Sequence, residues 1–110
     1  MDAEDIESLV AAFEATTLDP GRWTHAAHLT VALYYVGQYG SAFAVDWMRR
    51  GIQRYHAAVG GPSAYDETIT LAWMAIVARF HADHEGMALA DAARVLVERY
   101  SASRQASIMA

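Results

Sequence analysis

The sequence predicts an all-α fold, a compact four- or five-helix up-and-down bundle that forms a single domain over residues 1–110. Three observations predict it. Apolar residues recur at helical spacing through most of the chain, and the alternation typical of strands is hard to find. Glycine and proline fall in short stretches that divide the chain into segments of helix length. A length of 110 residues with 55% hydrophobic residues suits one domain with a real core.

The first half of the chain predicts two helices of different character. Residues 3–16 have an apolar face and an acidic face, as an amphipathic surface helix does. The Leu-Asp-Pro-Gly stretch at 18–21 ends it, because proline cannot continue a helix. Thr24 is a suitable N-cap for the next helix, which runs to about residue 36. Beyond its histidines this helix is apolar on nearly all sides, so we expect it at the centre of the bundle.

Three more helices are expected after Gly37 and Gly40, which we expect to end the central helix. Residues 41–59 form a half-exposed helix, and its expected apolar face carries Phe43, Trp47, Ile52 and Tyr55. Trp47 and Trp73 are expected in the core. Residues 66–81 form a largely buried helix, and residues 88–100 a final amphipathic one. The tail from about residue 101 is small, polar and expected to be loosely held.

Composition narrows the function classes. The net charge is −5 and all eight basic residues are scattered arginines, so we expect no nucleic-acid partner. Cysteine and lysine are absent, which excludes thiolate ligands, disulfides and Schiff-base chemistry. No apolar stretch has the length of a membrane span, and the acidic start is unlike a signal peptide. We therefore expect a cytoplasmic protein without a membrane partner.

Groups of metal-ligand type are predicted to meet at one end of the bundle. Short connections make consecutive helices antiparallel, so the start of the second helix, the end of the third and the start of the fourth share that end. These three places carry His25, His28, His56, Asp66 and Glu67. This convergence is the main sequence argument for a functional site.

The residue types indicate a divalent transition metal, which would be Zn, Fe, Mn or Cu. His25 and His28 are three residues apart and can share a helix face, and the helix start keeps imidazole neutral. Glu67 is expected as the third ligand or as a catalytic general base. Asp66 and His56 would complete or orient the ligand set. The candidate pocket-lining residues are Tyr55, Tyr65, Thr70 and Trp73.

Each of these groups also has a structural interpretation. Asp66 and Glu67 are favoured at any helix start, where they cap the chain and complement the dipole. The histidines at 25 and 28 can satisfy helix-end groups, and His56 can be a surface residue. His81 and His84 lie about 21 Å along the fourth helix from Glu67. We expect them at a solvated helix end, with a second site or a subunit contact as alternatives.

Two segments resemble a family of small bacterial proteins. They are Trp-Thr-His-Ala-Ala-His-Leu at 23–29 and Tyr-Asp-Glu-Thr-Ile-Thr at 65–70, with Met-Arg-Arg-Gly-Ile-Gln-Arg-Tyr at 48–55 between them. The family is marked by W-T-H-x-A-H-L and Y-H-E-T-I-T motifs, and the resemblance covers roughly residues 21–73. It implies that His25, His28 and Glu67 are motif positions, without implying a reaction. The chain departs from the pattern at Asp66, where the family has His, and at His56, where Asn is commoner.

Two functions follow as hypotheses. The first is a small helical metal-binding protein, with a metalloenzyme acting on a small-molecule substrate as its more specific form. The second is a non-catalytic helical interaction module, such as a homodimer in which the polar cluster is structural. The apolar excess supports the second, because a small chain can bury such surface in a subunit interface.

Overall fold

A computed structural model of the chain describes residues 1–60 and 65–101, and all helices in this part are α-helices apart from one 3₁₀ turn. The four α-helices are α1 (Ala3–Glu14), α2 (His25–Val59), α3 (Glu67–Asp83) and α4 (Leu89–Tyr100), and η1 (Pro20–Arg22) precedes α2. This confirms the predicted all-α bundle. The tail expected to be loosely held lies outside the described residues except for Ser101.

The helix starts follow from local capping. Asp2 and Asp5 form a capping box at the start of α1, in which each side chain accepts a hydrogen bond from the other residue's backbone N–H. The Thr24 hydroxyl accepts from the N–H of Ala27 at the start of α2, as predicted. Asp66 caps α3 by accepting from the N–H of Ile69. These caps fix where the candidate ligands begin their helices.

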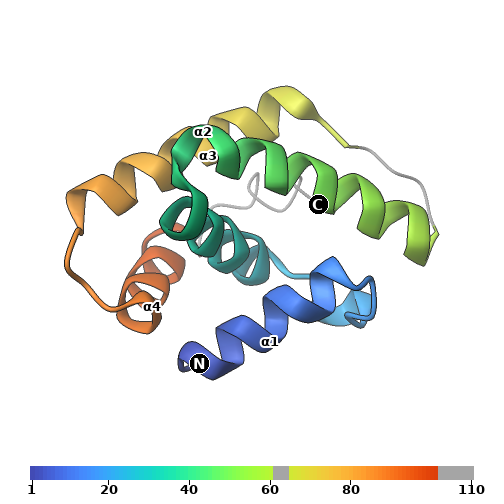
Figure 1. The fold of residues 1–110 in the computed structure, drawn as a ribbon, viewed down its shortest axis with the longest axis horizontal. Helices are drawn as coiled ribbons and strands as arrows, with labels where there is room; N and C mark the ends of the chain where they lie inside the picture. Colours follow the sequence, from blue (N-terminus) through green and yellow to red (C-terminus); the bar gives the residue numbers. More distant parts are fainter. Residues whose placement is uncertain (61–64, 102–110) are drawn as a thin grey trace.

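The expected second and third helices are the two parts of α2. The helical run continues through Gly37, which was expected to end it, and breaks only at Gly40, where φ is +82° and ψ is 159°. This backbone conformation favours glycine because an L side chain is strained there. In Figure 1 the two parts of α2 leave this turn in different directions, so the chain changes direction within one residue.

The turn at Gly40 lies at the surface, and this changes the predicted face of the second part of α2. Residues 37–43 are exposed on both sides of the turn. Phe43 is 70% exposed and Trp47 is also exposed, whereas Ile52 and Tyr55 are fully buried. The expectation that Trp47 belongs to the core was therefore wrong, because helical periodicity does not show where a helix projects beyond its neighbours.

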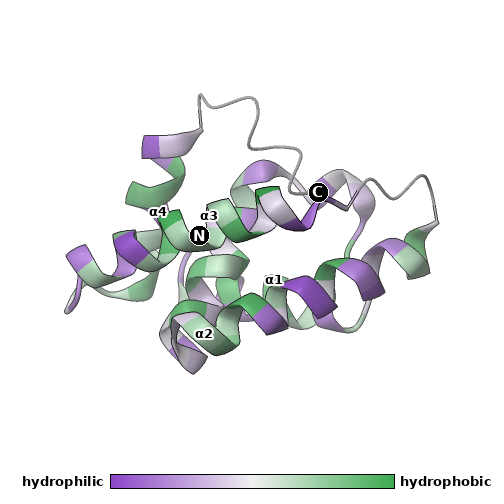
Figure 2. Ribbon diagram, turned by 90° about the horizontal axis from the view of Figure 1, so that it is seen from above, coloured by the Kyte–Doolittle hydropathy of each residue, from purple (hydrophilic) through white to green (hydrophobic). Residues whose placement is uncertain are grey.

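The core lies around α2, which contacts each of the other three helices. Gly51 allows α1 to approach closely, because a Cβ atom there would lie 2.6 Å from the Phe13 ring. Figure 2 shows hydrophobic and hydrophilic residues separated onto different sides of the helices, as burial of one face requires. In Figure 1 the end of α2 lies at the right edge of the molecule, whereas the start of α3 lies beside the middle of the second part of α2, where Glu67 contacts Arg49.

Candidate metal centre

His28 is the most unusual side chain at this end of the bundle. It lies in the first turns of α2, is only 1% exposed, and meets the Trp23 ring edge-on at a centroid distance of 4.0 Å. Neither ring nitrogen has a hydrogen-bond partner within the described residues. A neutral imidazole carries one N–H donor and one lone pair, so a donor and an acceptor are both left unsatisfied. Such groups are rare in protein interiors and call for an explanation.

The charge state of His28 follows from its surroundings. Its pKa is lowered to about 3, mainly because a buried cation loses its hydration, and also because of repulsion from charge on His25 and His56. The imidazole is therefore neutral at physiological pH. The influence of both other histidines also shows that they lie within electrostatic range. The three imidazoles predicted to converge do gather at one end of the bundle.

His25 reaches across to the end of α4. Its Nε2 lies 3.2 Å from the backbone oxygen of Tyr100, and its ring meets Trp73 edge-on at 5.3 Å. Because a carbonyl oxygen can only accept, this contact places the proton of the neutral ring on Nε2 and leaves a lone pair on Nδ1. Nδ1 is buried and has no partner within the described residues. Burial lowers the pKa of His25, and the bond to Tyr100 partly opposes that shift.

His56 occupies the last turn of α2 and is half-buried beside Tyr55, with the two ring centroids 6.4 Å apart. Burial lowers its pKa. His56 is also partly exposed to solvent. It forms the third member of a group that we call the histidine cluster, His25, His28 and His56.

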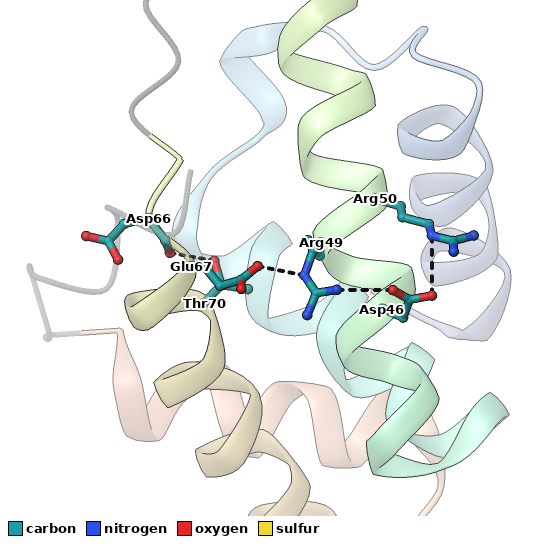
Figure 3. A network of polar contacts seen from close by, with 6 residues as sticks. All are labelled: Asp46, Arg49, Arg50, Asp66, Glu67 and Thr70. Atoms are coloured by element: carbon teal, nitrogen blue, oxygen red, sulfur yellow. Dashed lines mark hydrogen bonds and ion pairs between the residues drawn. The ribbon is translucent and has the colours of Figure 1, made fainter.

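The two predicted carboxylate ligands have partners of other kinds. Asp66 caps α3, and its backbone oxygen accepts from the Thr70 hydroxyl at 3.0 Å. Glu67 reaches from α3 to α2, where its Oε1 lies 2.7 Å from Nε of Arg49 in an ion pair without an aligned hydrogen bond. Figure 3 shows the Asp66–Thr70 and Glu67–Arg49 contacts around the start of α3. The capping interpretation of Asp66 is thus confirmed. The ion pair between Glu67 and Arg49 links α3 to α2.

Arg49 continues this contact into a short network along α2. Its Nη1 lies 3.3 Å from Asp46, and the other oxygen of Asp46 lies 3.3 Å from Nε of Arg50 (Figure 3). Arg49 was not predicted as the partner of Glu67. The available signal was weak, because which of three nearby arginines faces α3 depends on how α2 is rotated about its axis.

The four expected pocket-lining residues take different places. Trp73 contacts His25, and Thr70 is buried next to the α3 cap. The Tyr55 hydroxyl is already used, since it donates to the Leu18 backbone oxygen at 2.7 Å. The Tyr65 side chain packs against the core, and its buried hydroxyl has no partner within the described residues. Tyr65 thus adds another unsatisfied polar atom to those of His25 and His28.

The ligand set is not assembled as the sequence predicted. Within residues 1–60 and 65–101, no group of three or more His, Asp or Glu side chains is arranged to hold a metal ion. The structure brings the three imidazoles near one another, whereas the carboxylate of Glu67 points to Arg49. The metal and its ligands stay a prediction.

Comparisons with protein-family models, curated proteins and solved structures gave no match to this chain. The resemblance to a bacterial family in the segments at 23–29 and 65–70 therefore stays a prediction. Among the helices of the described residues, none is long and apolar enough to cross a membrane.

Proposed function

We propose that the chain is a small metal-binding protein whose histidine cluster binds a divalent transition metal ion. The observation that carries this proposal is His28, a fully buried imidazole with two unsatisfied nitrogens. Burying such a group costs about 1–3 kcal/mol for each unsatisfied atom. A ligand that accepts the lone pair removes part of that cost, and neutral imidazole is a common ligand of Zn²⁺, Cu²⁺, Fe²⁺ and Mn²⁺.

The geometry of His25 supports the same interpretation. Histidines that bind metals usually donate their other ring N–H to a carbonyl or a carboxylate, which fixes the tautomer and the ring orientation. The contact between Nε2 of His25 and the Tyr100 oxygen has this form, and it leaves Nδ1 available as a ligand atom. His25 would therefore bind through Nδ1 without breaking its contact with α4.

Binding requires side-chain movement, because no complete ligand set is arranged in the described residues. His56 is half-buried in the last turn of α2, and as a third ligand it would have to turn towards His28. Glu67 would have to leave its ion pair with Arg49 in order to become a ligand, and we propose His56 as the third ligand. Glu67 is then left as the candidate general base for a reaction with a small molecule, which the ion would assist as a Lewis acid.

The test is a calorimetric titration with ZnCl₂, together with elemental analysis of the purified protein. We expect about one equivalent of zinc and an increase in melting temperature, because a ligand of the folded state stabilises it. His28→Leu should abolish binding, whereas the matched control His81→Gln, which removes an imidazole elsewhere, should leave it unchanged. Equal zinc binding by the wild type and His28→Leu would contradict the proposal, as would the absence of binding in the wild type.

A second function, the non-catalytic interaction module, is favoured by a separate observation. Tyr39, Phe43 and Trp47 form an exposed aromatic patch next to the turn at Gly40, and the Tyr39 and Trp47 rings stack at 4.6 Å. Aromatic residues are enriched at interfaces. If the patch joins two copies as a homodimer, Phe43→Ser should convert the dimer to a monomer in light scattering. A monomeric wild type would contradict this function.

A further inference from the structure

A pocket lies at the opposite end of α3 from the histidine cluster. Its volume is about 360 Å³, and it lies between the first part of α2, the end of α3 and the start of α4. We call it the α3–α4 pocket. The polar residues that line it are Tyr34, Gln38, His81, His84 and Glu85. His81 and His84 were expected at a solvated helix end; both are half-buried there and line this pocket.

His84 presents a fixed hydrogen-bond acceptor. Its Nδ1 lies 2.7 Å from the backbone oxygen of Phe80, and its ring stacks on the Phe80 ring at 3.9 Å with an interplanar angle of 19°. Because the carbonyl oxygen can only accept, Nδ1 of the neutral ring carries the proton and Nε2 carries the lone pair. The contact and the stacking hold the ring in one orientation. His84 is therefore ready to accept a hydrogen bond from a ligand.

His81 adds a second imidazole from the last turn of α3. Its Nε2 faces α2 at Gly37, where an added Cβ atom would lie 3.7 Å away. His81 and His84 thus border the pocket from the same helix end, and His81 reaches across to α2. The two imidazoles are half-buried and line one pocket.

The charges around the α3–α4 pocket are negative. Glu85 lines it and forms no ion pair with any described residue, while no arginine lines it. Burial raises the pKa of Tyr34, and nearby Tyr39, Glu7 and Glu14 raise it further, so acidic groups also lie close to the wall formed by α2. Arg99 lies over the Phe80 ring but lines a different pocket. This distribution favours a cation over an anion.

The rest of the wall is apolar. Leu33, Leu89 and Ala92 contribute side chains of this kind from α2 and α4. A bare metal ion is not stabilised by contact with an apolar surface, whereas an organic cation can bury its hydrocarbon part there. The volume lies near the lower end of the range for small-molecule sites, about 300–1,000 Å³. The ligand should therefore be small, with one charged and one apolar end.

We propose that the α3–α4 pocket binds a small primary amine as its ammonium ion. The ammonium group donates to Nε2 of His84 and is neutralised by the Glu85 carboxylate, while the hydrocarbon part lies against Leu33 and Leu89. This site is independent of the histidine cluster. The two proposals are tested by different experiments, and failure of the metal site would not contradict the amine site.

The test is an NMR titration of the isotope-labelled chain with 2-phenylethylamine, using the neutral 2-phenylethanol as the comparison ligand. We expect the amine to shift the amide signals of Gln38, Gly86 and Leu89, and the alcohol to bind at least about tenfold more weakly. Glu85→Gln should weaken amine binding by about two- to fivefold, as expected for an ion pair with an exposed carboxylate. His84→Ala should weaken it as well.

The control is Glu98→Gln, which makes the same change in net charge on the exposed surface of α4. It should leave amine binding unchanged. Equal affinity for the amine and the alcohol, unchanged affinity in Glu85→Gln, or no shifts around the pocket would each overturn the proposal. Zinc binding at His84 without amine binding would overturn it too. Loss of zinc binding in His28→Leu bears only on the histidine cluster.

Discussion

Replacing His28 with leucine should stabilise the metal-free protein. The two unsatisfied nitrogens of this fully buried ring destabilise the fold by about 1 kcal/mol each, at the low end of the usual range. Leucine also fills a buried site, but it loses the edge-on contact with Trp23, which stabilises by about 1 kcal/mol. The expected net effect is a free energy of unfolding higher by about 1 kcal/mol, or a melting temperature higher by about 4–8 °C.

The assay is urea denaturation of the wild type and of His28→Leu in the presence of a chelator, with unfolding monitored by tryptophan fluorescence. A satisfied buried polar group provides the control. The Thr70 hydroxyl is buried and donates to the Asp66 backbone oxygen, so Thr70→Val should lower the free energy of unfolding by about 1 kcal/mol. The reasoning would be refuted if His28→Leu destabilised the chain as Thr70→Val does. His28 would then be a satisfied structural residue.

Three further predictions concern pH, charge and packing. Since the pKa of His28 falls from 6.5 to about 3 on folding, the unfolded chain binds the extra proton between these values. The free energy of unfolding should therefore fall by about 2 kcal/mol from neutral pH to pH ~5 in the metal-free protein, and pH-dependent denaturation of His28→Leu should lack this component. The Arg49–Glu67 ion pair is partly exposed, because 34% of the Arg49 side chain and 52% of the Glu67 side chain are accessible to solvent. A double-mutant cycle with Arg49→Gln and Glu67→Gln should therefore give a coupling free energy below about 1 kcal/mol. A coupling above about 2 kcal/mol would contradict its assignment as a solvent-screened ion pair. Gly51→Ala should lower the free energy of unfolding by about 1–3 kcal/mol, because its Cβ atom would lie 2.6 Å from the Phe13 ring; an unchanged thermal melt by circular dichroism would show that the ring can move away.

The sequence predicts the helices of this chain well because their ends have local causes. Thr24 and Asp66 were expected as N-caps and both accept the predicted kind of backbone hydrogen bond. The exact break inside α2 was harder to predict. Gly37 and Gly40 look alike in the sequence, and only the backbone shows that the positive φ falls at Gly40.

The gathering of His25, His28 and His56 could also be predicted, because it needs only antiparallel helices and short connections. The partner of Glu67 could not. An ion pair between α2 and α3 depends on how each helix is rotated about its axis, and Arg49 was one of several candidates. The contact of His25 with the Tyr100 backbone joins residues 75 positions apart and has no sequence signal.

The exposed aromatic patch could not be predicted from the sequence either. Phe43 and Trp47 share the helical spacing of the buried Ile52 and Tyr55. Periodicity therefore assigned all four residues to one apolar face. The turn at Gly40 places the first turns of this helical part at the surface, and a pattern within one helix carries no information about where its neighbours end.

The most direct test of the metal-binding account is a crystal structure of the protein grown with ZnCl₂, with anomalous data collected at the zinc edge. The account predicts an anomalous peak at about 2.0–2.1 Å from one nitrogen of His28, with Nδ1 of His25 as a second ligand. A protein crystal with no such peak, or with zinc bound only at His81 and His84, would contradict it.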